Sequence, residues 1–506
     1  MGSISLSMIV KNEEKYLEGC LESVKDVVDE IVIVDTGSTD RTKQIALQYD
    51  AIIHDFTWVN DFSVARNYAK TKCSGDWILY LDADERLDPL SKKEIHNIVS
   101  SNHKAGYFCQ VLSIDNETGR DHSIKYTRLF PNHPQIIFVG KVHEQIQPSL
   151  IQNGLPLLNS EILINHIGYN ISKAEKQNKA RRNLNLLLQD YDKNKSDYLA
   201  YQLGLTYQTL DEMDNACKYF KIAGSSNKLD KELKALCYSS LAFIAHRNQK
   251  VQEAEKYIFD SIKLDDKQPF SQLLAAKILL RKSDLIGAEK QCKQSFVLNK
   301  GLFNNKNHSL TSVYINPEEI IYFGMMLAYQ HSNDTNYQFY QNELYSHYDK
   351  LSGSKNSIKS VVLNKLLSNI PLSSKEEDVL VNISDKNNLG FFIFALTNYP
   401  DAQKKLNLAE KLFHKFPDEA ETGKFVAKLY ADLGNYQNSI IILEKLITIG
   451  NDDPAIYFYL LTYYLNIGQI EKLKSIVTQL EKKFPHIPEV ITRINILKQK
   501  LFLTAN

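Results

Sequence analysis

Two acidic motifs follow short apolar runs in the first 90 residues. Asp35 ends the run Ile31–Val34, and Asp82 and Asp84 follow the run Trp77–Leu81. Ligands of an open α/β sheet bind at the carboxyl ends of its strands, so these carboxylates are candidates for ligand contact. Asp35 could accept hydrogen bonds from a nucleotide base or ribose. The alternative for Asp35 is a helix-capping turn without a chemical role.

The second motif, a D-x-D sequence, has the composition of a metal site. If the strand continued past residue 81, Asp82 and Asp84 would point to the same side. Two carboxylates suit Mg²⁺ or Mn²⁺, which also accept diphosphate oxygens and waters as ligands. The motif therefore predicts a metal that holds a diphosphate and neutralises its charge as it leaves.

The elements that must position these residues alternate between strand and helix over residues 1–167. The apolar periodicity predicts strands at 4–10, 31–34, 51–54 and 77–81, and helices at 17–24, 40–48, 65–72 and from a capping box at 91–94. Such a pattern predicts a mostly parallel sheet covered by helices. From 106 to 166 we expect shorter strands, with a hairpin turn at 116–119.

Strands are expected to end near residue 171, where helices with a period close to 34 residues begin. One segment has the spacing of a tetratricopeptide repeat, at Leu203, Gly204, Tyr207, Ala216, Phe220 and Ala223. The same period separates Ala254 from Ala288, and the pair Tyr430/Gly434 from Tyr464/Gly468. Polar segments at 301–310 and 351–358 interrupt the array. A non-repetitive helical domain is the alternative.

The composition excludes several classes of protein. The 60 Lys and Arg residues balance 60 Asp and Glu residues, which argues against binding nucleic acid through a basic surface. We expect no transmembrane helix, because no run approaches 18 apolar residues, and no signal peptide. Six scattered cysteines argue against a zinc site or a disulfide framework. We therefore expect a cytoplasmic protein without integral membrane contact.

The motifs together resemble glycosyltransferase family 2, which has the GT-A fold. The resemblance covers about residues 3–167 and is carried by the segments 7–14, 35–40, 60–67, 76–85, 140–144 and 165–169. Fusion to tetratricopeptide repeats is similar to the bacterial peptide glycosyltransferases of the sublancin S-glycosyltransferase type. The resemblance implies an α/β, Rossmann-like GT-A domain with a mixed sheet, followed by an all-α tetratricopeptide-like solenoid.

We expect four parts in the chain: a catalytic domain at 1–170, a helical linker and repeats at 171–310, a helical middle segment at 311–385, and C-terminal repeats at 386–506. Each repeat alone cannot bury its apolar face, so neighbouring repeats must stack. A concave helical array suits an extended peptide acceptor, and a role in homodimer formation is equally compatible with the sequence.

The family resemblance also implies the ligands and the residues that bind them. It implies a nucleotide-sugar donor, usually a UDP-sugar, with Mn²⁺ or Mg²⁺ and inversion at the anomeric carbon. The residues that would bind the donor are Val10, Asn12, Glu13, Asp35, Asp61, Arg66, Asp82 and Ala83. The metal ligands would be Asp84, Asp82 and His166. For His166 a structural role is the alternative. For Arg66 the alternatives are packing over Trp58 or a salt bridge to Asp61.

A catalytic base must lie near the acceptor nucleophile. Many relatives supply it from a Glu-Asp pair after the D-x-D motif, and this chain has no such pair in that region. Glu144 is our candidate and His143 is the alternative. If neither is the base, the two residues brace the sheet.

Three functions remain open. The leading hypothesis is a bacterial enzyme that glycosylates a peptide or protein side chain, at a Ser or Thr oxygen or a Cys sulfur. The second keeps the enzyme but takes a cell-envelope saccharide or lipid-linked glycan as acceptor. The third is a tetratricopeptide scaffold with an inactive transferase domain.

Overall fold

The structure, a computed structural model, describes residues 2–101, 103–113, 120–168, 172–302, 311–352, 357–386, 388–485 and 487–503. The chain divides into two compact units, Met1–Ile320 and Ile321–Asn506, with the division inside helix α13 (Pro317–Gln330). The hairpin turn expected at 116–119 lies outside the described residues, as do most of the two expected polar interruptions. The domain boundaries expected near residues 170, 310 and 385 stay predictions.

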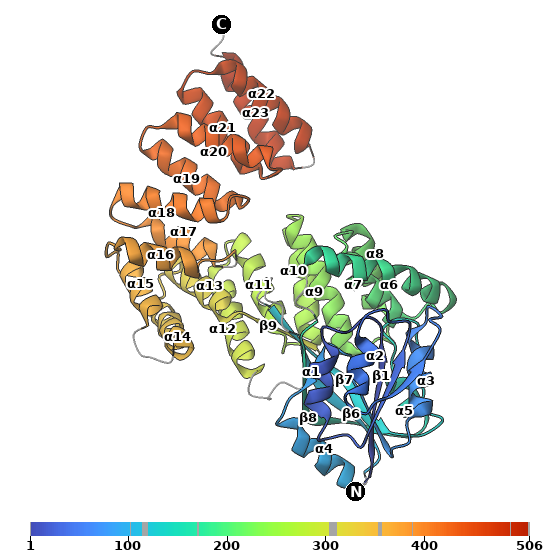
Figure 1. The fold of residues 1–506 in the computed structure, drawn as a ribbon. Helices are drawn as coiled ribbons and strands as arrows, with labels where there is room; N and C mark the ends of the chain where they lie inside the picture. The colour runs from blue at the N-terminus through green and yellow to red at the C-terminus, as the bar shows by residue number, and fades with distance from the viewer. Residues whose placement is uncertain are drawn as a thin grey trace. The chain divides into compact units, whose positions relative to one another are not determined.

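The first unit is built around a mixed sheet (Figure 1). Within the described residues the sheet has nine strands: β1 (Ile4–Val10), β2 (Glu30–Asp35), β3 (Ile52–Asp55), β4 (Trp77–Tyr80), β5 (Glu85–Leu87), β6 (Gly106–Ser113), β7 (Arg120–Pro131), β8 (Leu157–His166) and β9 (Thr311–Ile315). Their spatial order is β3-β2-β1-β4-β7-β6-β8-β5, and β9 pairs with β7. Strands β3, β2, β1 and β4 are parallel, whereas β7 is antiparallel to β4, β6 and β9. The expected mixed α/β sheet is confirmed.

Buried apolar runs account for the parallel half of the sheet. Every residue of β1 except Ile9 is buried, as are all four residues of β4. A strand covered on both faces needs apolar side chains at nearly every position. The helices that follow these strands in the chain are α1 (Leu17–Val24), α2 (Thr42–Leu47), α3 (Phe62–Lys72) and α4 (Ser91–Ser100). The expected strand at 4–10 and helix at 17–24 have the bounds that the sequence predicted.

Two local expectations about this unit are wrong. Helix α4 begins at Ser91, but the Ser91 hydroxyl forms no capping box. It accepts the Leu163 N–H at 2.8 Å and donates to the Leu163 carbonyl at 3.3 Å, because β8 lies against the start of the helix. The strands after residue 106 are also not shorter, since β6, β7 and β8 have 8, 12 and 10 residues.

The expectation that strands end near residue 171 is wrong as well. Strand β9 comes from the helical part of the chain and pairs with β7 from Arg120↔Ile315 to Ile124↔Thr311. Without β9, this half of β7 would present an unpaired backbone edge, which proteins usually cover. A strand from the helical part of the chain therefore completes the N-terminal sheet.

The remaining helices of the first unit follow β7 and β8 in the chain. They are α5 (Gln147–Gln152), α6 (Lys173–Lys193), α7 (Asp197–Thr209), α8 (Met213–Ser225), α9 (Lys231–Arg247), α10 (Val251–Leu264), α11 (Pro269–Arg281) and α12 (Leu285–Leu302). A Cβ on Gly204 would lie 2.6 Å from the Phe220 ring, and Tyr207 stacks on Tyr219 with ring centroids 5.5 Å apart. This close approach of a small residue and an aromatic ring is the packing that the repeat spacing predicts.

The second unit is helical throughout its described residues. Beyond α13, its helices are α14 (Asp334–Ser352), α15 (Ile358–Leu367), α16 (Ser374–Ile383), α17 (Leu389–Thr397), α18 (Ala402–Lys415), α19 (Ala420–Asp432), α20 (Tyr436–Thr448), α21 (Pro454–Asn466), α22 (Ile470–Lys483) and α23 (Pro488–Leu503). One contact occurs twice, 34 residues apart: Tyr430 bonds to Glu410, and Tyr464 bonds to Glu444. The glycine four residues after each tyrosine has a positive φ, 77° and 71°, just beyond a helix end. The two segments are thus structural repeats.

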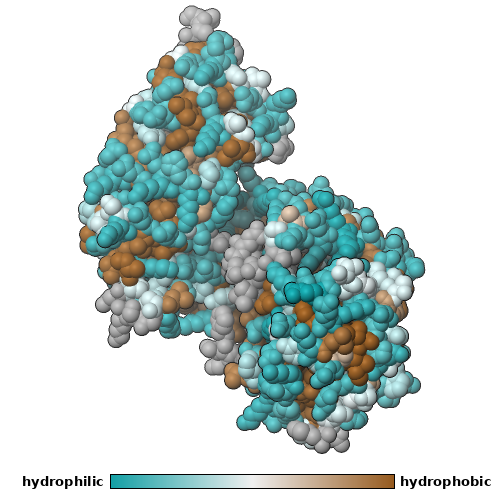
Figure 2. Space-filling view, viewed as in Figure 1, coloured by the Kyte–Doolittle hydropathy of each residue, from teal (hydrophilic) through white to brown (hydrophobic). Residues whose placement is uncertain are grey.

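The face of the molecule seen in Figure 2 is mostly hydrophilic, with hydrophobic side chains in small scattered groups. In the parts of the chain that the structure describes, no helix has both the length and the apolar character needed to cross a membrane.

Candidate active site

The acidic motif after β4 is a turn, so the alternation expected for a continuing strand does not apply. The Glu85 N–H donates to the Asp82 carbonyl at 3.0 Å, and the Asp82 N–H donates to the Glu85 carboxylate at 2.9 Å. Arg86 donates to the carbonyls of Ala83 (2.9 Å) and Glu85 (2.7 Å). These bonds hold the turn in a shape that brings both Asp82 and Asp84 to one cavity.

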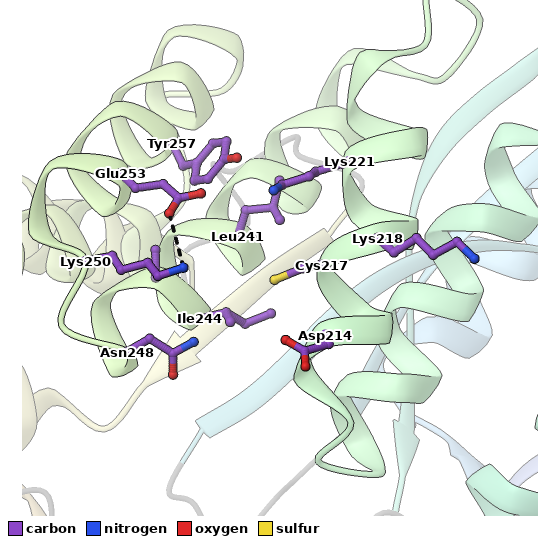
Figure 3. Close-up of a pocket in the computed structure, with 11 residues that line it drawn as sticks. Asp214, Cys217, Lys218, Lys221, Leu241, Ile244, Asn248, Lys250, Glu253 and Tyr257 are labelled. Carbon is purple, nitrogen blue, oxygen red and sulfur yellow. Dashed lines mark ion pairs between the residues drawn. The ribbon is translucent and has the colours of Figure 1, made fainter. Parts of the chain in front are cut away.

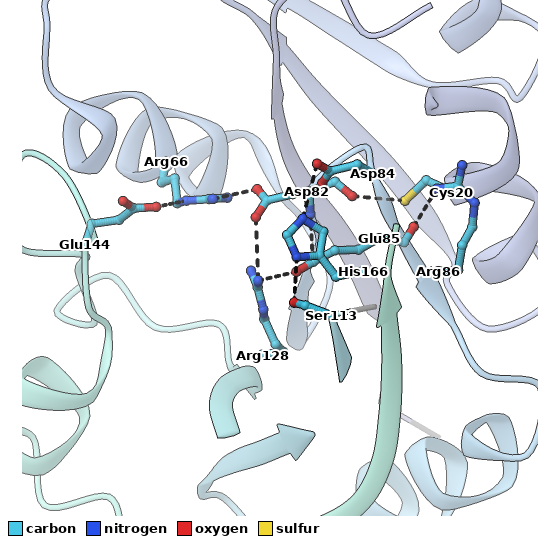
Figure 4. Close-up of polar contacts among 10 residues, drawn as sticks. All are labelled: Cys20, Arg66, Asp82, Asp84, Glu85, Arg86, Ser113, Arg128, Glu144 and His166. Atoms are coloured by element: carbon cyan, nitrogen blue, oxygen red, sulfur yellow. Dashed lines mark hydrogen bonds and ion pairs between the residues drawn. The ribbon is translucent and has the colours of Figure 1, made fainter. Parts of the chain in front are cut away.

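Asp82 lies between two buried arginines (Figure 4). Its Oδ1 is 2.7 Å from Arg66 Nη2, and its Oδ2 is 3.5 Å from Arg128 Nη2. Both guanidinium groups lie over the Tyr80 ring, 4.9 and 4.4 Å from its centroid. Burial raises the pKa of the Asp82 carboxyl, but the two guanidinium charges outweigh burial and hold that pKa below its ordinary value. Asp82 is therefore an ionised partner of arginines.

Arg128 is the main residue of this cluster that the sequence analysis missed. Its Nη2 is 2.5 Å from Glu85 Oε1, and both side chains are almost fully buried. Burial raises the pKa of Glu85 to about 7, against the opposing charge of Arg128. A charged residue within the apolar stretch 126–130 was the available signal. Buried charges of this kind are normally paired, so an acidic partner could have been expected.

Asp84 lies beside His166, the other residue expected with it as a metal ligand. Asp84 Oδ2 is 3.2 Å from His166 Nε2, and Ser113 Oγ is 3.0 Å from His166 Nδ1. Antiparallel pairing of β5 with β8 sets Glu85 opposite His166 and so brings the histidine to the turn. Burial lowers the pKa of His166, but the hydrogen bond and charge of Asp84 prevail and raise it.

Asp84 and His166 fit a Mn²⁺ or Mg²⁺ ion better than Asp82 does. Carboxylate oxygen and imidazole nitrogen are both accepted by Mn²⁺, and these ions usually complete their shell with phosphate oxygens and waters. The oxygens of Asp82 already face two guanidinium groups. Among the described residues, no three His, Cys, Asp or Glu side chains form a metal-holding set by themselves. The site therefore suits an ion that arrives with a phosphorylated ligand.

The two candidate bases lie on the loop between β7 and α5. Glu144 Oε1 bonds to Arg66 Nε, and its side chain is 11% exposed. The two alternatives for Arg66, a salt bridge to Asp61 and packing over Trp58, are wrong. The Arg66 guanidinium group instead forms ion pairs with Asp82 and Glu144. His143 is exposed and has a φ of 55°, in the left-handed region. Both Glu144 and His143 line the cavity.

The expected donor-binding residues at the ends of β1 and β2 form a hydrogen-bonded pair of loops. Asn12 Oδ1 accepts the Thr39 N–H at 2.8 Å. Asp35 Oδ1 accepts the N–H groups of Gly37 and Ser38, both at 2.8 Å, within the turn that precedes α2. Its Oδ2 is buried and has no hydrogen-bond partner among the described residues.

Val10, Glu13 and Ala83 line the cavity, whereas Asn12, Asp35 and Asp61 are not among its lining residues. Burial and the charge of Asp84 raise the pKa of Glu13 to about 7. Asp61 instead caps helix α3, because its Oδ1 accepts the Val64 N–H at 3.2 Å. The D-x-D turn, Arg66, Glu144, His143 and His166 are all brought together at the cavity.

The cavity has a volume of about 880 Å³. Sites for small molecules in proteins span about 300–1,000 Å³, so it could hold a nucleotide-sized ligand. Part of its wall comes from beyond the expected catalytic domain, from Lys179, Arg182, Asn183, Asn185, Leu186 and Gln189 of α6 and Tyr198 of α7. The sequence analysis assigned no role to these residues, because their contact with the cavity depends on how α6 packs.

Another cavity, of about 340 Å³, lies between α8, α9 and α10 (Figure 3). Lys250 and Glu253 form an ion pair in it at 3.9 Å, and burial raises the pKa of the Cys217 thiol there. It lies apart from the strand ends that carry the acidic motifs, and we assign it no part in the chemistry.

Comparisons with known proteins show what the chain is similar to. Residues 5–150 match the family model "Glycosyl transferase family 2". A TPR repeat-containing protein of Synechococcus elongatus is 36% identical over 213 residues, covering 40% of this chain and 52% of that protein. The SPbeta prophage-derived glycosyltransferase SunS of Bacillus subtilis is 35% identical over 190 residues, covering 36% of this chain and 44% of that protein.

The chain thus spans about half the length of these curated relatives. A solved tetratricopeptide repeat protein from Parabacteroides merdae aligns with 60% of this chain and 98% of its own, at 14% identity and a TM-score of 0.36. Residues 5–150 form a glycosyltransferase family 2 domain, and the same chain joins it to tetratricopeptide-like helices.

Proposed function

We propose that this chain is an inverting, metal-dependent glycosyltransferase that moves a sugar from a UDP-sugar to a peptide or protein side chain. One observation carries the proposal: a single cavity at the strand ends contains Asp84 with His166 on one side and Glu144 on the other. The family match and the relative named as a glycosyltransferase support the reaction class.

Each charged residue of the cavity has a distinct part in the proposal. Asp84 and His166 would hold Mn²⁺ or Mg²⁺, and the bound ion would neutralise charge on the departing diphosphate. Asp82 anchors Arg66, whose Nε also bonds to Glu144. Arg66 is a positioning residue because it connects the metal-binding turn to the base.

Glu144 is proposed as the base that removes the proton of the acceptor nucleophile. The buried Arg66 orients its carboxylate toward the cavity that it lines. Held in this way, the carboxylate loses little entropy when the acceptor arrives. His143, on the same loop, remains the alternative.

The acceptor is proposed to be a Ser or Thr hydroxyl or a Cys thiol of a peptide or protein. The resemblance to peptide glycosyltransferases supports this choice, as do helical repeats that complete the catalytic sheet through β9. We expect the reaction to take place in a bacterial cytoplasm.

The test is incubation of the purified chain with a panel of nucleotide sugars and Mn²⁺, with release of nucleoside diphosphate as the readout. We expect one UDP-sugar to release UDP, EDTA to stop release, and Mn²⁺ or Mg²⁺ to restore it. The variant Asp84→Asn, which tests the metal role, should be folded and inactive. Release that persists in EDTA, or in folded Asp84→Asn, would contradict the metal role. No release from any donor in the panel would contradict the enzyme.

A further inference from the structure

Helix α6 lines the cavity that also contains Glu13 and Glu144. Near its start, Lys179 is close enough to Glu13 for its charge to act on that carboxyl, and Glu13 follows the end of β1. Near its end, Asp190 Oδ2 accepts the Lys141 N–H at 3.1 Å, and Lys141 Nζ donates to Gln189 Oε1 at 3.2 Å. Lys141 lies on the loop that carries Glu144. The residues between these ends therefore lie along the cavity.

The two faces of α6 have different partners. Leu184, Leu187, Leu188 and Tyr191 pack into an apolar cluster with residues of α7 and α8. Lys179, Arg182, Asn183 and Leu186 line the cavity at intervals of three and four residues, as one face of a helix does. Packing of the leucine face thus turns the cationic face toward the cavity.

The two cations on this face are available to a ligand. Lys179 and Arg182 are exposed, and in the described part of the chain neither takes part in an ion pair. Arg182 Nε donates only to Asn183 Oδ1, at 3.2 Å. The other arginines of the cavity, Arg66 and Arg128, are already occupied by carboxylates. Among the described residues, the cavity cations outside ion pairs are therefore Lys179 and Arg182 of α6, together with Lys11 just after β1.

We propose that Lys179 and Arg182 form a diphosphate-binding subsite, supplied by a helix outside the family 2 match. This inference rests on the proposed function, since the diphosphate is that of the nucleotide donor. The diphosphate joins the nucleoside to the sugar, so it lies between the Glu13 end of the cavity and the Glu144 end. Lys179 and Arg182 line the same cavity as Asp84. A guanidinium group can bind two phosphate oxygens at once, and an ammonium group adds a point charge.

The experiment measures binding of UDP and of uridine, each with Mn²⁺, by titration calorimetry on the full chain. The variants are Lys179→Met, Arg182→Met and the double substitution. Arg181→Met is the matched control, because Arg181 is exposed on the same helix but does not line the cavity. Each charge-assisted contact is worth enough that each single variant should lose about tenfold in UDP affinity. Uridine affinity should not change, and Arg181→Met should match the wild type for both ligands.

Each other outcome overturns the inference in a recognisable way. Equal losses for UDP and uridine would show that α6 shapes the cavity without binding phosphate. Equal losses in Arg181→Met and Arg182→Met would show a general effect of charge. If the double variant binds UDP as tightly as the wild type, the proposed subsite is wrong, but the proposed function is not contradicted. If the wild type binds no UDP with Mn²⁺, the proposed donor fails first, before any variant is compared.

Discussion

Gly168 leaves the space that the Asp84 carboxylate occupies. A Cβ on Gly168 would lie 1.8 Å from Asp84 Oδ2 and 2.5 Å from its Cγ. The two segments are also tied by the backbone, because the Ile167 N–H donates to the Asp84 carbonyl at 3.0 Å. A side chain at position 168 must therefore displace the carboxylate from His166.

We predict that Gly168→Ala raises the Mn²⁺ concentration needed for activity and lowers the activity itself, while the protein stays folded. Displacement of a catalytic group by about 1 Å can cost on the order of 100-fold in rate. The measurement is nucleoside diphosphate release as a function of Mn²⁺ concentration. Gly301→Ala is the control, since a Cβ there meets nothing within 4 Å. Equal Mn²⁺ dependence in the two variants would show that Asp84 does not need its observed position.

We predict that Glu144→Gln lowers kcat by about 100-fold or more and leaves UDP affinity nearly unchanged, because a general base acts in the transition state. The glutamine keeps the size of the side chain and an oxygen that can accept from Arg66. Single-turnover transfer and equilibrium UDP binding separate the two effects. If Glu144→Gln is active and His143→Ala is inactive, the histidine is the base. If both are active, the loop is structural.

We predict opposite effects for two glycines of the first repeat. A Cβ on Gly204 would lie 2.6 Å from the Phe220 ring, whereas one on Gly224 would make an ordinary contact at 3.5 Å with Cys237. Overpacking costs roughly 1–3 kcal/mol, so Gly204→Ala should unfold at a lower temperature. Gly224→Ala should gain up to about 1 kcal/mol from helix propensity. Thermal melts of the full chain test this, and equal melting temperatures would contradict the close packing of α7 on α8.

We predict that one half-buried histidine makes the chain less stable in acid. Burial and the positive charges of Arg281 and Lys277 lower the pKa of His246 to about 4, and its Nδ1 is buried without a hydrogen-bond partner among the described residues. As the pH falls from about 6.5 to about 4, the unfolded chain binds this proton and the folded chain does not, so the free energy of unfolding falls over this range.

His246→Gln removes this titration and leaves every other ionisable group in place. The melting temperature of the variant should therefore fall less than that of the wild type between pH 7 and pH 4.5. Parallel curves over this range would show that His246 is protonated equally in both states.

Much of this protein follows from local sequence. The strand Ile4–Val10 and the helix Leu17–Val24 were predictable because hydrophobic periodicity acts over a few residues. The same holds for the pairing of Gly204 with Phe220, since the repeat spacing places small and aromatic residues on facing helices. The acidic turn at the end of β4 could also be located from the sequence, because its chemistry lies in neighbouring residues.

Only the tertiary structure decided which partners the charged residues take. Arg128 and Asp82 are 46 positions apart, and their contact depends on β7 pairing with β4. That pairing brings Arg128 to Asp82, and the separate pairing of β5 with β8 brings His166 to Asp84, although the D-x-D motif treats the two aspartates alike. The position of β9 in the sheet and the position of α6 on the cavity wall also depend on contacts between distant segments. Contacts between distant segments depend on how whole faces bury their apolar surface, which no local pattern specifies.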